Sequence, residues 1–191
     1  VAILSKLPLS EIRCGLGDGV DDPQQRIVSA RVDGIRVISA YVPNGQSLDS
    51  DKWSYKLRWL ERLRAYLESH HSPSEPLILC GDFNVAPDPR DVHDPAAWEG
   101  SVLFHPEARA ALERVRGWGL HDAFRLHHAE AGFYSWWDYR AGAFRRNQGL
   151  RIDHILITAP LAKRCKSVEI DREERKGDKP SDHAPVVAIF E

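Results

Sequence analysis

The chain has 191 residues, 42% of them hydrophobic and 28% charged, and its formal net charge at pH 7 is -2. This composition is typical of a folded, water-soluble protein with one substantial core. It excludes disordered and fibrous chains, and also membrane-spanning ones, because no apolar run reaches the length of a bilayer crossing. A nearly neutral charge also excludes a general attraction to nucleic acid, so binding of that kind would depend on local charge.

The N-terminal end, Val1 to Ser5, is mostly apolar and predicts a buried strand. The sequence contains no methionine. Because a native chain rarely begins inside a strand, we expect this sequence to lack an N-terminal portion of its domain.

A β-hairpin is predicted next. Two alternating runs rich in β-branched residues, Ile27–Val32 and Ile35–Val42, flank the dipeptide Asp33-Gly34, which is the strongest short signal for a hairpin turn. A proline and a glycine stop the second strand. Tyr41 and Asn44 are therefore expected at the rim of the sheet.

An amphipathic helix is predicted from Asp51 to His70, where leucines and tryptophans recur at helical spacing. The next element is a short apolar strand, Leu77 to Cys80, which suits burial on both faces, and Gly81 breaks it. Asp82 and Asn84 then lie two positions apart, so in an extended segment they point the same way. A metal ion or a phosphate would suit such a pair. The alternative is an Asx turn, in which both side chains bind their own backbone.

A polar connector, residues 86–100, follows this strand. Its carboxylates could bind a cation, but a solvated connector is favoured, and they include Asp88, Asp91 and Asp94. A helix is predicted at His105–Arg116, and one or two helical turns at Leu120–Arg125. The chain ends with three predicted strands and a charged loop: Ile152–Thr158, Cys165–Asp171, Pro185–Phe190 and the loop Arg172–Lys179.

No repeat, low-complexity tract or linker divides the chain, so we expect residues 1–191 to form a single domain. Strands outnumber helices, and helices come singly between strands. This order predicts a mixed α/β fold in which helices cover the outer faces of packed, mostly antiparallel sheets. The three cysteines, Cys14, Cys80 and Cys165, are far apart and are expected as small core residues in a cytoplasmic protein.

Chemically reactive residue types recur at the ends of the predicted strands. They form the pairs Tyr41 and Asn44, Asp82 and Asn84, Asp153 and His154, and Asp182 and His183. Each pair has an ordinary structural explanation, such as an ion pair between Asp153 and a nearby arginine. If the strand ends converge, they assemble carboxylates for a divalent cation, a histidine that a carboxylate orients, and neutral donors for an anion. Such a set suits phosphodiester hydrolysis.

The segment 136–151 combines aromatic residues with arginines. Flat apolar surface beside guanidinium groups suits nucleic acid binding, while core tryptophans with surface arginines explain the pattern equally well. The residues are Trp136, Trp137, Tyr139, Arg140, Arg145, Arg146 and Arg151.

Five motifs in the chain belong together. They are Tyr41-Val-Pro-Asn-Gly, Gly81-Asp-Phe-Asn, Ser135-Trp-Trp-Asp-Tyr-Arg, Gly149-Leu-Arg-Ile-Asp-His and Ser181-Asp-His-Ala-Pro-Val. In this order they resemble the exodeoxyribonuclease III family of the endonuclease/exonuclease/phosphatase superfamily. The second and fifth motifs are shared across that superfamily, whereas the third and fourth point to its DNA repair branch.

This resemblance implies a four-layered α/β sandwich with the site at one edge of two packed sheets. It also implies a monomeric DNA repair nuclease that depends on Mg²⁺, with Mn²⁺ as a substitute. The substrates implied are double-stranded DNA with abasic sites or blocked 3′ ends. The implied activities are a 3′ to 5′ exonuclease, a 3′ phosphatase or phosphodiesterase, and an endonuclease that cleaves 5′ to abasic sites.

The resemblance carries roles onto individual residues. The catalytic residues would be Tyr41, Asp82, Asn84, Asp153 and His183. Asp82 would act on the attacking water, and His183, oriented by Asp153, would bind the phosphate or act as the base, so the residue that takes the proton stays open. The metal would be held by Asp182 together with Asp82 and Asn84. The substrate would meet Asn44, Arg140 and a pocket for a flipped abasic sugar made by Trp136, Leu150 and Ile152.

The sequence departs from the family at its beginning. The family's first strand carries an asparagine and its second a glutamate, the principal metal ligand, and neither motif occurs here. Two alternatives therefore stand beside the nuclease. One is a catalytically silent DNA-binding remnant, and the other is a phosphoesterase acting on a different phosphate ester, against which the arginine-rich segment argues.

Overall fold

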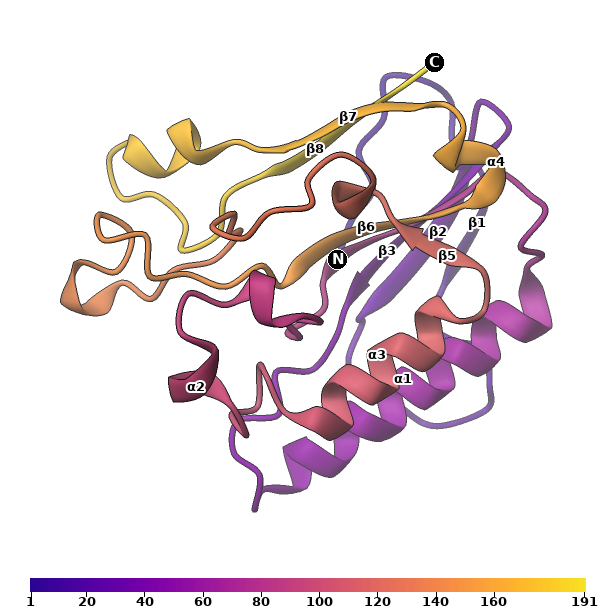
Figure 1. The fold of residues 1–191 in the computed structure, drawn as a ribbon. Coiled ribbons are helices and arrows are strands. Elements are labelled where there is room, and N and C mark those ends of the chain that lie inside the picture. The colour runs from indigo at the N-terminus through magenta and orange to yellow at the C-terminus, as the bar shows by residue number, and fades with distance from the viewer.

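The computed structural model describes all of residues 1–191 and contains eight strands and four α-helices (Figure 1). The strands are β1 (Ser10–Cys14), β2 (Ile27–Val32), β3 (Ile35–Tyr41), β4 (Leu77–Asp82), β5 (Leu120–Asp122), β6 (Asp153–Thr158), β7 (Cys165–Ile170) and β8 (Val186–Phe190). The helices are α1 (Asp51–His70), α2 (Pro95–Trp98), α3 (Pro106–Arg116) and α4 (Ala159–Ala162). Short 3₁₀ turns lie in the connections, at Pro89–Asp91, Phe124–Leu126, Arg140–Gly142 and Arg172–Lys176.

Six strands form one mixed sheet in the order β1-β2-β3-β4-β6-β5, and β7 pairs with β8 in a second sheet. Neighbouring strands are antiparallel except β3 and β4, which are parallel. The β2–β3 hairpin forms because Asp33 and Gly34 both adopt a positive φ, of 46° and 78°, as a two-residue turn of this kind requires. The parallel pair needs a long crossover, which α1 provides.

Helix α1 begins at Asp51 because the hydroxyl of Ser50 accepts a hydrogen bond from the Lys52 amide. Its buried face joins α3 and the large sheet in the main core. Figure 1 shows α1 and α3 side by side on one face of this sheet, with β7 and β8 on the other. Apolar residues of the large sheet's second face, such as Ile35 and Ile155, pack against a buried cluster that includes Val168 of β7. The prediction of a mixed α/β fold with two packed sheets and flanking helices is confirmed.

Two sequence-based predictions are wrong. Val1–Ser5 is not a strand, since these residues have no strand partner and Leu4 is 95% exposed. Of the helical turns predicted at residues 120–125, a 3₁₀ turn is present at Phe124–Leu126, but Leu120–Asp122 is strand β5, which pairs with β6. Three residues are too few to show a period of their own, so the neighbouring strand decides the conformation.

The cysteines are all free, but Cys14 is exposed and Cys80 and Cys165 are only partly buried, so the expectation of three core thiols was too simple. No helix in the structure combines enough length with enough apolar character to cross a bilayer.

Candidate active site

The ends of three strands meet at one edge of the large sheet. The parallel register of β3 and β4 places Tyr41 opposite Asp82, and the antiparallel register of β4 and β6 places Asp82 opposite Asp153. His183 reaches the same place from the segment before β8, where its Nδ1 lies 2.8 Å from Oδ2 of Asp153. The pairs predicted at separate strand ends therefore converge.

The backbone at this edge tolerates little change. Gly81 has a φ of 140°, and a Cβ atom there would lie 1.9 Å from the backbone oxygen of Ala40. Only glycine permits β3 and β4 to approach this closely. The chain then turns at Asn84, whose φ of 51° lies in the left-handed region that asparagine tolerates better than most residues.

A chain of short hydrogen bonds links the two asparagines to Asp82. The backbone N–H of Asn84 donates to Oδ1 of Asp82 at 2.8 Å, and the side-chain amide of Asn84 donates to Oδ2 of Asp82 at 3.0 Å. The side chain of Asn44 in turn donates to Oδ1 of Asn84 at 2.8 Å. The Asx turn that the sequence offered as an alternative is thus present, and it also fixes the orientation of Asp82.

The electrostatics of the site follow from two neighbouring carboxylates. Burial raises the pKa of Asp82, and the charge of Asp153 raises it further, to about 7. Burial acts to lower the pKa of His183, but the hydrogen bond to Asp153 and the nearby carboxylate charges outweigh it, so this pKa is raised. Protons are therefore held or released here near neutral pH, as acid–base catalysis requires.

Asp82, Asp153 and His183 could hold a metal ion, because each offers a ligand atom and these atoms lie within 4.8 Å of one another. Burial and, after it, the charge of Asp153 raise the pKa of Asp82, and a divalent cation between the two carboxylates would offset both effects by favouring the ionised form. The donor set therefore fits such an ion. Asp182, also expected at the metal, lies outside this group and accepts a hydrogen bond from the Trp136 indole at 2.9 Å.

The residues expected to form the sugar pocket lie beside this group. Trp136 and Leu150 exchange two backbone hydrogen bonds of 2.9 Å. The backbones of Trp136 and His183 also form an isolated antiparallel β-bridge. Leu150 and Ile152 are buried in one apolar cluster, and Trp136 packs against this cluster. Arg140 is exposed at the surface and pairs with Asp138 at 2.8 Å.

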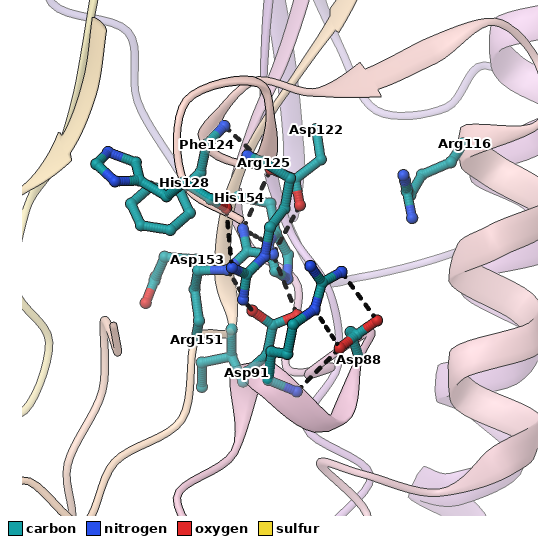
Figure 2. A network of polar contacts seen from close by, with 12 residues as sticks. Asp88, Asp91, Arg116, Asp122, Phe124, Arg125, His128, Arg151, Asp153 and His154 are labelled. Carbon is teal, nitrogen blue, oxygen red and sulfur yellow. Dashed lines mark hydrogen bonds and ion pairs between the residues drawn. The ribbon is translucent and has the colours of Figure 1, made fainter. Parts of the chain in front are cut away.

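The aromatic and arginine-rich segment does not form one binding surface. Trp137 is 0% exposed and Arg151 is 1% exposed, so neither is available to a nucleic acid. The alternative of a core tryptophan is correct for Trp137, whereas the alternative of a surface arginine is wrong for Arg151. Figure 2 shows that the guanidinium of Arg151 instead lies between Asp91 and Asp122.

This pairing also corrects the expectation of a solvated acidic connector, since Asp91 is 0% exposed. Sequence reasoning missed two further buried groups beside the site, Lys56 and Asp122, and it named His154 only as one of the reactive residues at strand ends. Lys56 had a signal, because it falls on the apolar stripe of α1 between Trp53 and Leu60, where a lysine is out of place.

Comparisons with known proteins agree with this geometry. The sequence model of the Endonuclease/Exonuclease/phosphatase family matches residues 1–183. The chain is 38% identical to exodeoxyribonuclease III of Haemophilus influenzae over 202 residues, covering 100% of this chain and 76% of that protein. It is 32% identical to an exodeoxyribonuclease of Bacillus subtilis, covering 99% of this chain and 73% of the relative.

Solved structures are similar over nearly the whole chain. An AP endonuclease from Archaeoglobus fulgidus superposes with a TM-score of 0.92 at 41% identity, covering 96% of this chain and 72% of that one. The 3′ phosphatase NExo from Neisseria, solved with a product DNA hairpin, superposes with a TM-score of 0.93 at 39% identity, covering 98% and 73%.

Proposed function

The chain belongs to the endonuclease/exonuclease/phosphatase family, and we propose that it is a hydrolase that cleaves phosphate esters in double-stranded DNA. The observation that carries this proposal is the convergence of Asp82, Asp153 and His183 at one sheet edge, within 4.8 Å of one another. Relatives named as exodeoxyribonucleases and a DNA-bound neighbour support DNA as the substrate.

The cofactor we propose is Mg²⁺, with Mn²⁺ as a substitute, held by the carboxylates of Asp82 and Asp153 with Asp182 and Asn84 close by. When bound, it supplies positive charge that neutralises the phosphate and stabilises the departing oxygen.

The protein's own groups divide the remaining tasks. Asp82, whose orientation is fixed by Asn84, positions the attacking water. Either Asp82 or His183 accepts the proton of this water. Asp153 orients His183 through the 2.8 Å hydrogen bond. Asn44 is exposed and has one side-chain N–H left for the phosphate, whereas both side-chain N–H groups of Asn84 are already donated to Val42 and Asp82. Tyr41, 44% exposed at the end of β3, offers its hydroxyl to the developing charge.

For the finer activities, we propose cleavage 5′ to abasic sites, 3′ to 5′ exonuclease activity and removal of 3′ phosphates. Trp136, which is partly exposed, would contact a flipped abasic sugar, and the buried Leu150 and Ile152, which were expected to touch the sugar, would instead support Trp136 from behind, so that the apolar wall leaves no polar partner for a base. Exposed Arg140 would meet the DNA backbone once released from Asp138. We also propose that residues 1–191 act as one domain and that the protein works as a monomer.

The experiment compares three duplexes: one with a single abasic site, one with a 3′ phosphate and one with a plain recessed 3′ end. Each is incubated with the protein in Mg²⁺ or in EDTA, with an inositol phosphate as a control substrate. We expect products from the DNA substrates that EDTA abolishes. DNA binding without turnover would instead identify a silent DNA-binding protein, and turnover of the inositol phosphate alone would identify a different phosphoesterase.

A further inference from the structure

The backbone that follows Asp82 is buried although it belongs to no regular element. Phe83, Asn84, Val85 and Ala86 are between 0% and 4% exposed. Buried carbonyl groups outside helices and sheets need donors from elsewhere, since an unpaired one costs as much as a lost hydrogen bond. Two successive carbonyls, those of Asn84 and Val85, find these donors in buried basic side chains.

Lys56 supplies the first donor, from α1. Its side chain is 0% exposed, and no carboxylate lies within ion-pairing distance. Its Nζ donates to the backbone oxygens of Asn84 at 2.7 Å, Val102 at 2.6 Å and Asn44 at 3.1 Å. These three carbonyl acceptors match the three N–H groups of an ammonium, so this one side chain joins both asparagines of the site to α1.

His154 supplies the second donor, from β6. Its Nε2 lies 2.8 Å from the oxygen of Val85, and because a carbonyl only accepts, Nε2 carries the proton. Its Nδ1 lies 3.1 Å from Nη1 of Arg151, which only donates, so Nδ1 carries none. The two contacts together fix a neutral imidazole in a single tautomer.

Arg151 can fix this tautomer because it is itself held by two carboxylates (Figure 2). Its Nε donates to Asp91 at 2.7 Å and its Nη2 to Asp122 at 2.7 Å, while Nη1 also reaches Asp122 at 3.2 Å. The Arg151 amide donates to the backbone oxygen of Asp91 at 2.8 Å. Asp91 binds Arg125 as well. A forked guanidinium paired in this way keeps one orientation, which lysine could not reproduce.

We propose that Lys56, together with the relay from Asp91 and Asp122 through Arg151 to His154, positions Asn84 and thereby Asp82 against the reacting phosphate. The inference rests on the proposed function. These are positioning residues, because they touch the substrate-facing groups and not the substrate. A buried ion network is often neutral for stability, so orientation of the site is a reason for keeping this one beside it.

Two variants of His154 separate the effect of its hydrogen bond to Val85 from the effect of its packing. His154→Phe removes the donor to Val85, whereas His154→Gln keeps an amide N–H near the position of Nε2. A displacement of about 1 Å at a reacting group costs on the order of 10²-fold in rate, so we expect His154→Phe to lower kcat by about that factor with KM for DNA nearly unchanged. His154→Gln should recover most of the rate.

Thr158→Val is the matched control. Thr158 lies at the far end of β6, where its hydroxyl donates to Glu75 O at 2.6 Å and accepts from the Leu77 amide at 3.0 Å. The Thr158→Val variant therefore loses hydrogen bonds between β6 and the start of β4, as His154→Phe loses one between β6 and the segment after β4. We expect a lower Tm with the wild-type kcat. A wild-type kcat in folded His154→Phe, or equal damage from both His154 variants, would overturn the proposal.

The tautomer of His154 can also be tested by NMR spectroscopy, which does not depend on catalytic activity. Long-range ¹H–¹⁵N spectra of the wild-type protein should show His154 protonated at Nε2 only, and Arg151→Met should release this preference. A proton on Nδ1 in the wild type would refute the relay. If the wild type shows the expected tautomer but no turnover of any DNA substrate, the proposed function fails while the contacts stand.

Discussion

Replacing Asp82 by asparagine should stabilise the metal-free protein while it lowers the rate of catalysis by orders of magnitude. Burial and the charge of Asp153 raise the pKa of Asp82 from 3.8 to about 7. A carboxyl with a raised pKa keeps its proton in the folded state after the unfolded state has released it. Stability therefore falls as the pH rises from the unfolded to the folded pKa, and an asparagine escapes this loss.

The structure gives the size of the effect. From about pH 5 the wild-type free energy of unfolding falls by about 1.36 kcal/mol for each pH unit, and this slope halves as the pH reaches the folded pKa of about 7, so the total loss is about 2 kcal/mol. The raised pKa of His183 acts in the same direction, because its stabilisation is also lost as the pH rises. Asparagine offers one acceptor where ionised Asp82 accepts two hydrogen bonds from Asn84, and this loss of about 1 kcal/mol opposes the gain.

The assay is urea unfolding in EDTA, followed by tryptophan fluorescence at both pH values. We expect the stability of Asp82→Asn relative to the wild type to rise by up to about 2 kcal/mol between about pH 5 and about pH 7. Asp138→Asn is the control, because Arg140 lowers the pKa of Asp138 and no gain of this kind should occur. Parallel pH dependence of wild type and Asp82→Asn would refute the reasoning.

Three further changes test the site. Gly81→Ala should lower the free energy of unfolding in urea by at least about 3 kcal/mol, because the new Cβ would meet the β3 backbone. The control Gly100→Ala, where φ is also positive but the space is open, should lower it by about 1 kcal/mol. Asp153→Asn should lower the pKa of His183, read from imidazole NMR shifts in EDTA, and an unchanged pKa would contradict the assigned hydrogen bond. Trp136→Ala should slow abasic-site cleavage more than 3′ phosphate removal, and equal losses would exclude it from the sugar pocket.

Local sequence patterns correctly predicted the elements that have a characteristic turn motif or hydrophobic periodicity. The turn Asp33-Gly34 and the twenty-residue stripe of α1 appear in the structure at the predicted residues. Strand β5 did not have such a signal, because its three residues take their conformation from pairing with β6. Val1–Ser5 shows the reverse case, an apolar run without a partner strand.

The candidate site was predictable where motifs mark it and not where distant charges meet. Asp82, Asp153 and His183 follow from strand ends and from the family resemblance. For Arg151 the sequence favoured nucleic acid binding and an ordinary surface position equally, but its partner Asp91 lies 60 residues away in a segment predicted to be solvated. A single sequence does not show that two such charges are buried together, since each alone is typical of the surface.

The most direct test of the central claim is single-turnover cleavage of a duplex with one abasic site, in Mg²⁺, by the wild type and by Asp82→Asn, with DNA affinity measured on the same samples. We expect the wild type to cleave 5′ to the site and the variant to lose about 10²–10⁴-fold in rate at similar affinity. Equal cleavage by both proteins, or loss of binding in proportion to rate, would contradict the account, because the converging strand ends would then not be the place where the phosphate reacts.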